Sequence, residues 1–412
     1  MPQYYEENQR IEYTGAYDVI VVGGGVAGVG AAIAAAREGL SVLIIEKTIA
    51  LGGQATLGHV VKYEPMDDNG RQIIGGIAEE LLKKSILYGY DNLPQEWKAK
   101  LGIDDWKPVD DKAAEHKNKE RRMATFFNVP AFVFALDEMM DQEGIEVSYD
   151  TLFCAPIMEG DSCTGLIVET KSGRHAYHAK MIVDASGDSD VLFRCGAECV
   201  DQDNFVTFMG YDIDFEKMKD AIDNNNMYRA IPDWLMLGYD PLTKTGATPD
   251  KFYGTSVKGV NGFARASRAA AFEHLKRNLR PDYTILSIPS ILAFRTTRRI
   301  AGLYTLTEND IHKHFEDSIG SACDWRKPGP LYEIPYRALI DKKLKNVIAV
   351  GRIIASHGDA WEITRVIPPA VMTGQAGGTA AAMALKHNIP LQQVNVSELQ
   401  KKLEKTGVLI HF

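Results

Sequence analysis

The sequence has few cysteines and no excess of positive charge. Its five cysteines in 412 residues include no C-x-x-C pair. This usage is typical of reduced thiols in a cytoplasmic protein, and it offers neither the spacing of a metal or iron–sulfur site nor a redox pair. Lys and Arg number 46 against 55 Asp and Glu, for a net charge of −9. We therefore expect no nucleic-acid partner, because such proteins present a basic face.

Long uncharged apolar runs are also scarce. The run from Val19 to Ala36 is interrupted by five glycines, and Met1–Asp18 before it carries more acidic than basic residues. A signal peptide would place basic residues there. We therefore expect neither a signal peptide nor a membrane partner.

That same run holds a glycine motif, Gly23-x-Gly25-x-x-Gly28, between an apolar strand at 19–22 and an Ala-rich helix that ends at Arg37. In such a motif the first glycine allows a tight turn, the second lets the backbone approach a pyrophosphate, and the third lets helix and strand pack closely. The first helical turn, with Val26 and Ala27, would direct free N–H groups at the phosphates.

A second apolar strand, Ser41–Glu46, completes a β-α-β unit. Glu46 follows Gly28 by eighteen residues, the place of a carboxylate that binds an adenosine ribose. A carboxylate there would repel a 2′-phosphate, so NADP is disfavoured while FAD and NAD both stay open.

The segment after Glu46, KTIALGGQAT, contains a Gly52–Gly53 pair. With this segment the chain resembles the bacterial FAD-dependent oxidoreductases that have a glutathione-reductase-type FAD domain. The resemblance implies FAD as cofactor, with the Gly-Gly segment along the pyrophosphate and ribityl chain. Its implied contacts are Lys47, Gly52, Gly53, Gln54, Ala55 and Thr56.

Two later segments also resemble this family. MIVDASGDSDV (181–191) implies a turn at Ser186–Gly187 near the FAD. Residues 346–384 resemble the C-terminal FAD segment, in which a strand ends at Gly351 and the helix after Pro368 directs its N-terminus at the flavin.

Two arginines and one acid in the C-terminal segment are further candidates. Arg365 is the candidate cation for negative charge on the reduced flavin, the alternative being a surface salt bridge. Arg352 stands where many relatives carry an acid that bonds the ribityl chain, and Asp359 could replace that acid.

Residues 294–310 resemble a further segment of this branch. If helical, it would place Arg295, Arg298 and Arg299 on one face, to clamp a substrate carboxylate or phosphate or else to pair with acidic residues. His59 and His357 are candidate general bases, with a hydrogen-bonding loop histidine as the alternative for each.

The predicted fold class is α/β, a Rossmann-like FAD-binding domain with an inserted α+β substrate domain. The FAD-binding domain would comprise 17–145, 180–204 and 336–412. The substrate domain would comprise 205–335 with strands from 146–179, and 91–122 would be a charged surface insertion. Residues 205–288 show no alternation of helix and strand patterns.

The predicted function is hydride transfer between a small polar organic substrate and FAD. The alternatives are a flavin hydroxylase or reductase supplied by NAD(P)H, a thiazole-synthase-like NAD enzyme, and a redox-inert FAD-binding scaffold. The sequence leaves open a homo-oligomer and does not identify the substrate.

Overall fold

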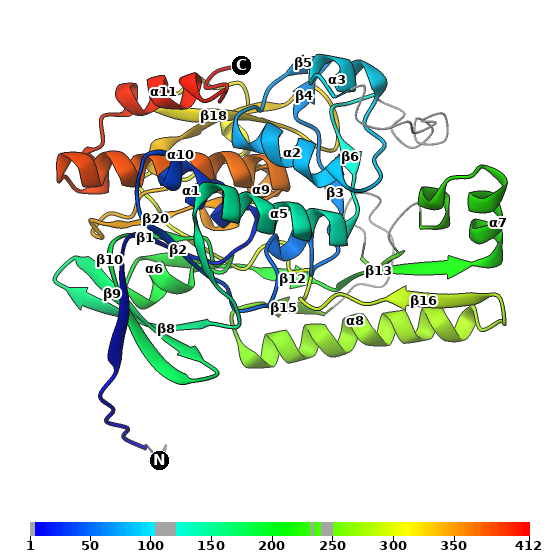
Figure 1. Cartoon of the computed structure of the whole chain (residues 1–412), viewed down its shortest axis with the longest axis horizontal. Coiled ribbons are helices and arrows are strands. Elements are labelled where there is room, and N and C mark those ends of the chain that lie inside the picture. The colour runs from blue at the N-terminus through cyan, green and yellow to red at the C-terminus, as the bar shows by residue number, and fades with distance from the viewer. Residues whose placement is uncertain (1–4, 104–120, 232–234, 240–249) are drawn as a thin grey trace.

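The computed structural model describes residues 5–103, 121–231, 235–239 and 250–412 (Figure 1). Its α-helices are α1 (Val26–Arg37), α2 (Ile77–Leu87), α3 (Gln95–Lys100), α5 (Val129–Glu143), α6 (Asp190–Arg194), α7 (Phe215–Asp223), α8 (Val257–Arg277), α9 (Gly358–Thr364), α10 (Ile367–His387) and α11 (Val396–Lys405).

The strands are β1 (Glu12–Val22), β2 (Val42–Ile45), β3 (Lys62–Tyr63), β4 (Asp67–Asp68), β5 (Arg71–Gln72), β6 (Thr125–Phe126), β7 (Glu146–Ser148), β8 (Leu152–Glu159), β9 (Ser162–Thr170), β10 (Gly173–Asp184), β11 (Cys199–Asp201), β12 (Asp203–Phe205), β13 (Thr207–Asp214), β14 (Leu235–Gly238), β15 (Lys251–Tyr253), β16 (Tyr283–Ser287), β17 (Arg298–Ile300), β18 (Ser318–Cys323), β19 (Leu331–Pro335) and β20 (Val347–Ala349).

The largest sheet of the described residues has seven strands in the order β7-β2-β1-β10-β9-β8, with β20 also paired to β10. β7, β2, β1, β10 and β20 run parallel, whereas β9 and β8 are antiparallel. Residues 19–22 and 42–45 are buried throughout, as expected for parallel strands covered on both faces. The predicted α/β fold class is confirmed.

The carboxyl ends of the parallel strands meet at one edge of this sheet. Val22, Ile45, Asp184 and Ala349 occupy equivalent positions in the strand register. The loops that follow therefore start side by side, which is the arrangement that forms ligand sites in open α/β sheets.

Helices α1 and α10 pack backbone against backbone. A Cβ added to Gly374 would lie 2.1 Å from the carbonyl oxygen of Ala27, and one added to Gly378 would lie 2.2 Å from that of Ala31. Gly30 approaches the carbonyl oxygen of Val371 in the same way, at 2.7 Å. Only glycine permits this separation, so the two helices are fixed closely together.

A second group of elements lies at the lower right of the molecule in Figure 1. It contains a sheet in the order β14-β13-β16, the pair β12-β15, and α8 against β13 and β14. The 21-residue α8 was not expected in a stretch without helix–strand alternation. Its buried residues recur every four positions along one face, at Gly259, Phe263, Ser267 and Ala271. The helix is capped by Ser256, whose Oγ accepts from the N–H of Gly259 at 3.0 Å.

The strands within 146–179 differ from their predicted grouping with the substrate domain. β7 extends the parallel sheet beside β2, and β8 and β9 form a meander that continues from β10 in the same sheet. The cause is β10 itself, whose 12 residues pair with β9 at one end and with β20 at the other. The division into two domains otherwise stays a prediction.

The predicted charged insertion, 91–122, falls mostly on residues 104–120, outside the described ranges. Its described ends combine exposed residues, such as Glu96 and Lys100, with buried ones. Trp97 is 2% exposed, and Lys98 forms an ion pair with Asp91 at 2.9 Å.

The apolar run 19–36 forms the end of β1, the glycine turn and α1. Among the described residues, no helix combines the length and apolar character that a bilayer crossing requires.

Candidate active site

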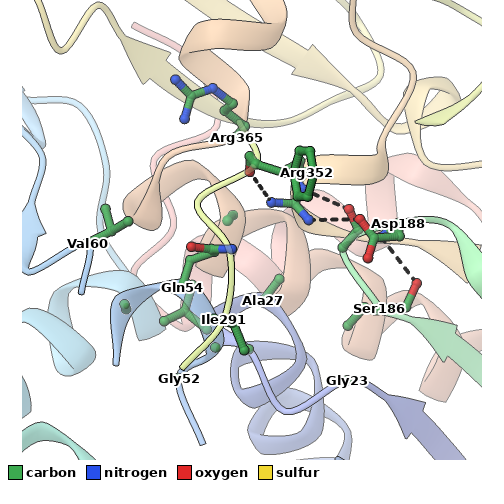
Figure 2. Close-up of a pocket in the computed structure, with 18 of the residues that line it drawn as sticks. Gly23, Ala27, Gly52, Gln54, Val60, Ser186, Asp188, Ile291, Arg352 and Arg365 are labelled. Atoms are coloured by element: carbon green, nitrogen blue, oxygen red, sulfur yellow. Dashed lines mark hydrogen bonds and ion pairs between the residues drawn. The ribbon is translucent and has the colours of Figure 1, made fainter. Parts of the chain in front are cut away.

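A cavity of about 600 Å³ opens at the carboxyl ends of β1, β2, β10 and β20. Figure 2 shows part of its lining. It brings together most of the predicted site residues, from segments far apart in the sequence: Gly23, Gly25, Val26, Ala27, Glu46, Lys47, Gly52, Gly53, Gln54, Ala55, Ser186, Gly187, Arg295, Arg352 and Arg365.

The three motif glycines have different surroundings. Gly23 has φ +104°, which favours glycine. A Cβ added to Gly25 would meet no heavy atom within 4 Å, so this backbone faces the open cavity. A Cβ on Gly28 would lie 1.9 Å from the carbonyl oxygen of Gly23. Gly28 therefore sits behind the cavity, where helix and turn meet.

Glu46 follows β2 and is 5% exposed. Its Oε2 accepts from the N–H of Gly24 at 2.7 Å, and its Oε1 accepts from the N–H and the hydroxyl of Thr48 at 2.8 and 2.7 Å. These bonds fix the carboxylate at the cavity wall, and Oε2, which accepts only one of them, keeps a lone pair for a ligand hydroxyl.

The Gly52–Gly53 segment lies beside the first glycine turn. The N–H of Gly52 donates to the carbonyl of Gly24 at 2.8 Å, and both glycines have positive φ. Gln54 donates to the carbonyl of Leu292 at 2.7 Å, which links this segment to the second group of elements. Thr56 lies outside the cavity lining, and its hydroxyl donates to the carbonyl of Leu51.

Asp184 organises the turn at Ser186–Gly187. Its Oδ1 accepts from the N–H and hydroxyl of Ser186, and its Oδ2 accepts from the N–H groups of Val191 and Leu192 at 3.0 and 2.9 Å. Burial raises the pKa of Asp184 to about 6, although these donors favour the charged form.

Arg352 joins three segments of the wall. It donates to the carbonyls of Gly187 and Phe294, both at 2.7 Å, and to Oδ1 of Asp188 at 3.0 Å (Figure 2). Asp188 also lines the cavity. Sequence reasoning missed it, although it ends the ASGD stretch that was singled out, and it is better placed than Asp359 to meet a ligand hydroxyl.

The N-terminus of α10 also contributes to the cavity wall, through Arg365, Val366 and Ile367. Arg365 forms an ion pair with Glu362. Burial acts against the charge on Glu362, but Arg365 beside it outweighs that effect and lowers the pKa of the carboxyl group.

Glu64 is a buried carboxyl group that the sequence analysis missed. It follows β3, lines the cavity and accepts from the N–H of Ile367 at 3.2 Å. Burial raises its pKa to about 6, opposed by the nearby charges of Lys62 and Arg365. The segment 57–66 carries no family motif, and only the fold brings it to the start of α10.

Several predicted residues lie away from the cavity lining. His59 is partly buried with its ring centroid 5.3 Å from that of Tyr211, and burial lowers its pKa. His357 is exposed at the start of α9, and both carboxylate oxygens of Asp359 bind Arg326.

Gly351 and Pro368 lie just behind the wall. The N–H of Gly351, at φ +71°, donates to the hydroxyl of Thr373 at 2.9 Å, and Pro368 is in the first turn of α10.

The predicted helical face of three arginines does not form, because residues 298–300 pair as strand β17 with β11. Arg298 forms an ion pair with Asp190 at 2.8 Å, and Arg299 is 5% exposed near the ring of Trp361. Of the three, only Arg295 lines the cavity.

Part of the cavity lining comes from the second group of elements and from Trp325. Met209 of β13, Met236 of β14 and the segment 291–294 supply apolar surface there. Arg295, Lys62 and Glu64 supply charge.

The residues fit FAD. The space in front of Gly25 is a cradle that a side chain would fill, and the N-termini of α1 and α10 both face the cavity. Two buried polar atoms of the lining, Oε1 of Gln54 and Nε of Arg365, have no hydrogen-bond partner among the described residues. A polar ligand along this wall would satisfy them.

Comparisons with known proteins agree with this fit. The profile of the family described as FAD dependent oxidoreductase matches residues 18–205 and 257–403. No curated protein sequence matches the chain.

Three solved structures resemble the chain at low sequence identity. The p-nitrophenol 4-monooxygenase of Pseudomonas putida is 12% identical, with 95% of this chain and 87% of that chain covered and a TM-score of 0.48. A flavoprotein/dehydrogenase of Cytophaga hutchinsonii is 14% identical, with 94% and 84% covered and a TM-score of 0.42. A geranylgeranyl bacteriochlorophyll reductase-like protein of Thermoplasma acidophilum is 14% identical, with 95% and 83% covered and a TM-score of 0.40.

The family match spans well over half of the chain and includes every segment of the FAD motif. FAD is therefore the cofactor and the protein is an oxidoreductase. The chain belongs to the FAD dependent oxidoreductase family.

Proposed function

We propose that this enzyme transfers a hydride between a small polar organic substrate and FAD. Bound FAD supplies the hydride acceptor or donor. The observation that supports the proposal is the make-up of the cavity lining, which joins the motif residues around Glu46 to Met209, Trp325 and Arg295 of other segments. These residues outside the FAD motifs would contact a second molecule.

The residues proposed to hold the cofactor come from the motif segments of the cavity lining. Glu46 would accept from ribose hydroxyls, and the backbone at Gly25 and the first turn of α1 would bind the pyrophosphate. Gln54 and Asp188 would bind hydroxyls between the pyrophosphate and the ring. Arg365 and the start of α10 would stabilise negative charge that develops on reduction.

The substrate end favours a molecule with an apolar body and an anionic or polar group. Met209, Met236 and Trp325 would contact the body, while Arg295 and Lys62 would attract the polar group. This adds an apolar body to the small polar substrate that the sequence predicts.

Glu64 is the proposed acid–base group for the substrate. Its carboxyl group lies on the cavity wall between Lys62 and the start of α10, and its pKa of about 6 permits both protonation states near neutral pH. Neither His59 nor His357 lines the cavity. Glu64 would hold the proton that a hydroxyl or amine loses when the adjacent carbon gives up a hydride.

The first test is a visible spectrum of the purified protein, followed by heat or acid release of the chromophore and its identification by mass. The holoprotein would then be mixed anaerobically with sugars, hydroxy acids and amines. Bleaching by one of these, without a nicotinamide, is the expected result. Bleaching by NADH or NADPH alone would support the hydroxylase or reductase alternative, and a protein that stays oxidised with every donor except dithionite would indicate an inert scaffold.

A matched pair of variants tests the role of Glu64. Glu64→Gln should slow bleaching by the substrate tenfold or more but leave bleaching by dithionite unchanged, since dithionite needs no proton acceptor on the wall. Glu404→Gln changes an exposed carboxylate of α11 and should alter neither rate. Equal substrate rates in wild type and Glu64→Gln would remove the acid–base role.

A further inference from the structure

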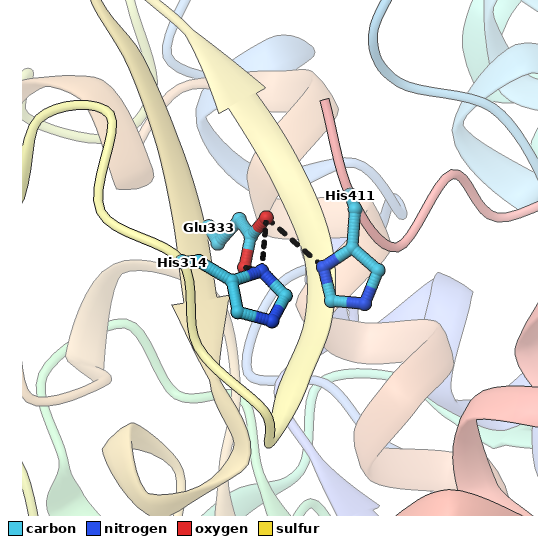
Figure 3. Close-up of side chains that lie close together, drawn as sticks. All are labelled: His314, Glu333 and His411. Carbon is cyan, nitrogen blue, oxygen red and sulfur yellow. Dashed lines mark hydrogen bonds and ion pairs between the residues drawn. The ribbon is translucent and has the colours of Figure 1, made fainter.

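A cluster of two histidines and one glutamate lies outside the cavity. His314 precedes β18, Glu333 is in β19 and His411 follows α11 (Figure 3). One ligand atom from each residue lies within 4.8 Å of the other two. None of the three belongs to the FAD motifs.

Both imidazoles turn a ring nitrogen toward the same carboxylate. Oε1 of Glu333 lies 2.9 Å from Nδ1 of His411 and 3.4 Å from Nδ1 of His314, and Oε2 lies 3.3 Å from Nδ1 of His314. The two rings are 4.7 Å apart between centroids. In a tetrahedral zinc site with bonds of about 2.0–2.2 Å, neighbouring ligand atoms are about 3.3 Å apart. The observed separations are close to that value.

A bound cation would also neutralise the buried charge of Glu333. The glutamate side chain is 2% exposed, and no Lys or Arg in the described ranges forms an ion pair with it. The two basic side chains beside it are histidines, and an imidazole offsets the charge of a carboxylate only when it is protonated. A buried carboxylate without a permanent counter-charge is costly, and a bound dication would neutralise it.

The three ligands are held in place by their surroundings. The N–H of Phe315 donates to Oε2 of Glu333 at 2.7 Å, which directs Oε1 toward the imidazoles. The segment before His411 is fixed on β18, where Ser318 and Ser321 both donate to the carbonyl of Ile410, at 2.8 and 3.2 Å. The site therefore needs little rearrangement to accept an ion.

We propose that His314, Glu333 and His411 form a site for Zn²⁺ or a similar first-row dication, with solvent as the fourth ligand. Imidazole and carboxylate ligands suit this class of ion. The ion would connect the segment 408–411 to β19. The His314 and His411 side chains are 58% and 42% exposed, which gives the ion a path from solvent.

The test uses the untagged, FAD-loaded protein after dialysis against EDTA. Titration with ZnCl₂ followed by calorimetry should give one site per chain, and saturating Zn²⁺ should raise the midpoint of thermal unfolding. Co²⁺ in place of Zn²⁺ should give the visible absorption bands of a four-coordinate ion, read as a difference spectrum against the flavin.

Two variants should weaken Zn²⁺ binding at least tenfold, His411→Ala and His314→Ala. Both change exposed side chains, and retention of the flavin spectrum checks that each variant is folded. His387→Ala removes an exposed histidine, the last residue of α10, and should bind Zn²⁺ as wild type does. Failure of wild type to bind Zn²⁺, or equal binding by wild type and His411→Ala, would overturn the proposal. These readouts do not depend on the substrate or on the hydride transfer proposed above.

Discussion

The N–H of Gly24 donates to Oε2 of Glu46 over 2.7 Å, so the turn after β1 and the end of β2 are bonded directly to each other. The residue between Gly23 and Gly25 thus positions the carboxylate that would bind ribose. The same carboxylate in turn satisfies a backbone donor of the glycine turn. In the proposed placement of FAD, binding of the adenosine and of the pyrophosphate would therefore depend on one shared contact.

Glu46→Gln tests this shared contact. The amide keeps one acceptor but places an NH₂ against donors, so a charge-assisted bond is lost at a cost of about 1.5–3 kcal/mol. We expect the affinity for FAD to fall by about 10- to 100-fold, measured by fluorescence titration of the FAD-free protein. Unchanged affinity would show that Glu46 serves the turn alone.

Gly25→Val and Gly28→Ala separate cofactor binding from folding. At position 25 a side chain would enter the open cavity, so we expect a folded protein that does not retain FAD. At position 28 even a Cβ would collide with the carbonyl oxygen of Gly23, and overpacking of this kind costs about 1–3 kcal/mol. Thermal unfolding and flavin absorbance of both variants would distinguish the effects. A Gly25→Val protein with full FAD content would contradict the proposed pyrophosphate position.

Arg365→Met tests stabilisation of the reduced cofactor. Removal of a cation at the cavity wall should lower the two-electron reduction potential, by about 30 mV for each 1.4 kcal/mol of lost stabilisation. Spectroelectrochemistry would measure the shift. Arg337→Met removes an arginine that pairs with Asp317 away from the cavity and should leave the potential unchanged. A potential in Arg365→Met equal to that of wild type would assign Arg365 to its ion pair with Glu362.

The raised pKa of Glu64 predicts that the free energy of unfolding depends on pH. Burial raises its pKa from 4.5 to about 6 in the folded state, so the folded protein binds more protons than the unfolded chain between these values. The contribution of Glu64 to the free energy of unfolding therefore falls as pH rises through this window, by about 2 kcal/mol. Urea unfolding of the FAD-free protein at pH 4.5 and pH 7 would measure it.

Glu64→Gln should lose this part of the pH dependence, because an amide does not ionise. The difference in stability between wild type and variant should change by about 2 kcal/mol across the window. A constant difference would mean that Glu64 keeps an ordinary pKa in the folded protein.

The sequence was sufficient to predict the β-α-β unit and many of the residues that line the cavity. Gly23, Gly25 and Gly28 have the surroundings that their spacing predicted, because a turn, an open approach and a close packing each require glycine locally. Arg352, a candidate from the C-terminal segment, lines the cavity, but its bonds to Gly187 and Phe294 depend on segments that only the fold brings together.

The remaining features depend on long-range contacts. Glu64 has no motif around it and reaches the cavity because β3 lies opposite the start of α10. Arg298 and Arg299 were expected on a helical face, but pairing of their segment with β11 makes it a strand. His59 and His357 lie close to the motifs in the sequence, but closeness in sequence does not determine the direction of a side chain.

The backbone contact between α1 and α10 has a consequence for ligand length. Gly374 and Gly378 set the separation of these helices through contacts with Ala27 and Ala31, independently of any ligand. The two helix N-termini at the cavity are therefore a fixed distance apart. With the proposed placement of FAD, a dinucleotide would reach both at once, whereas a flavin mononucleotide would have no adenosine to place at Glu46 while its ring lay at α10. We therefore expect the fixed helix separation to favour the longer flavin.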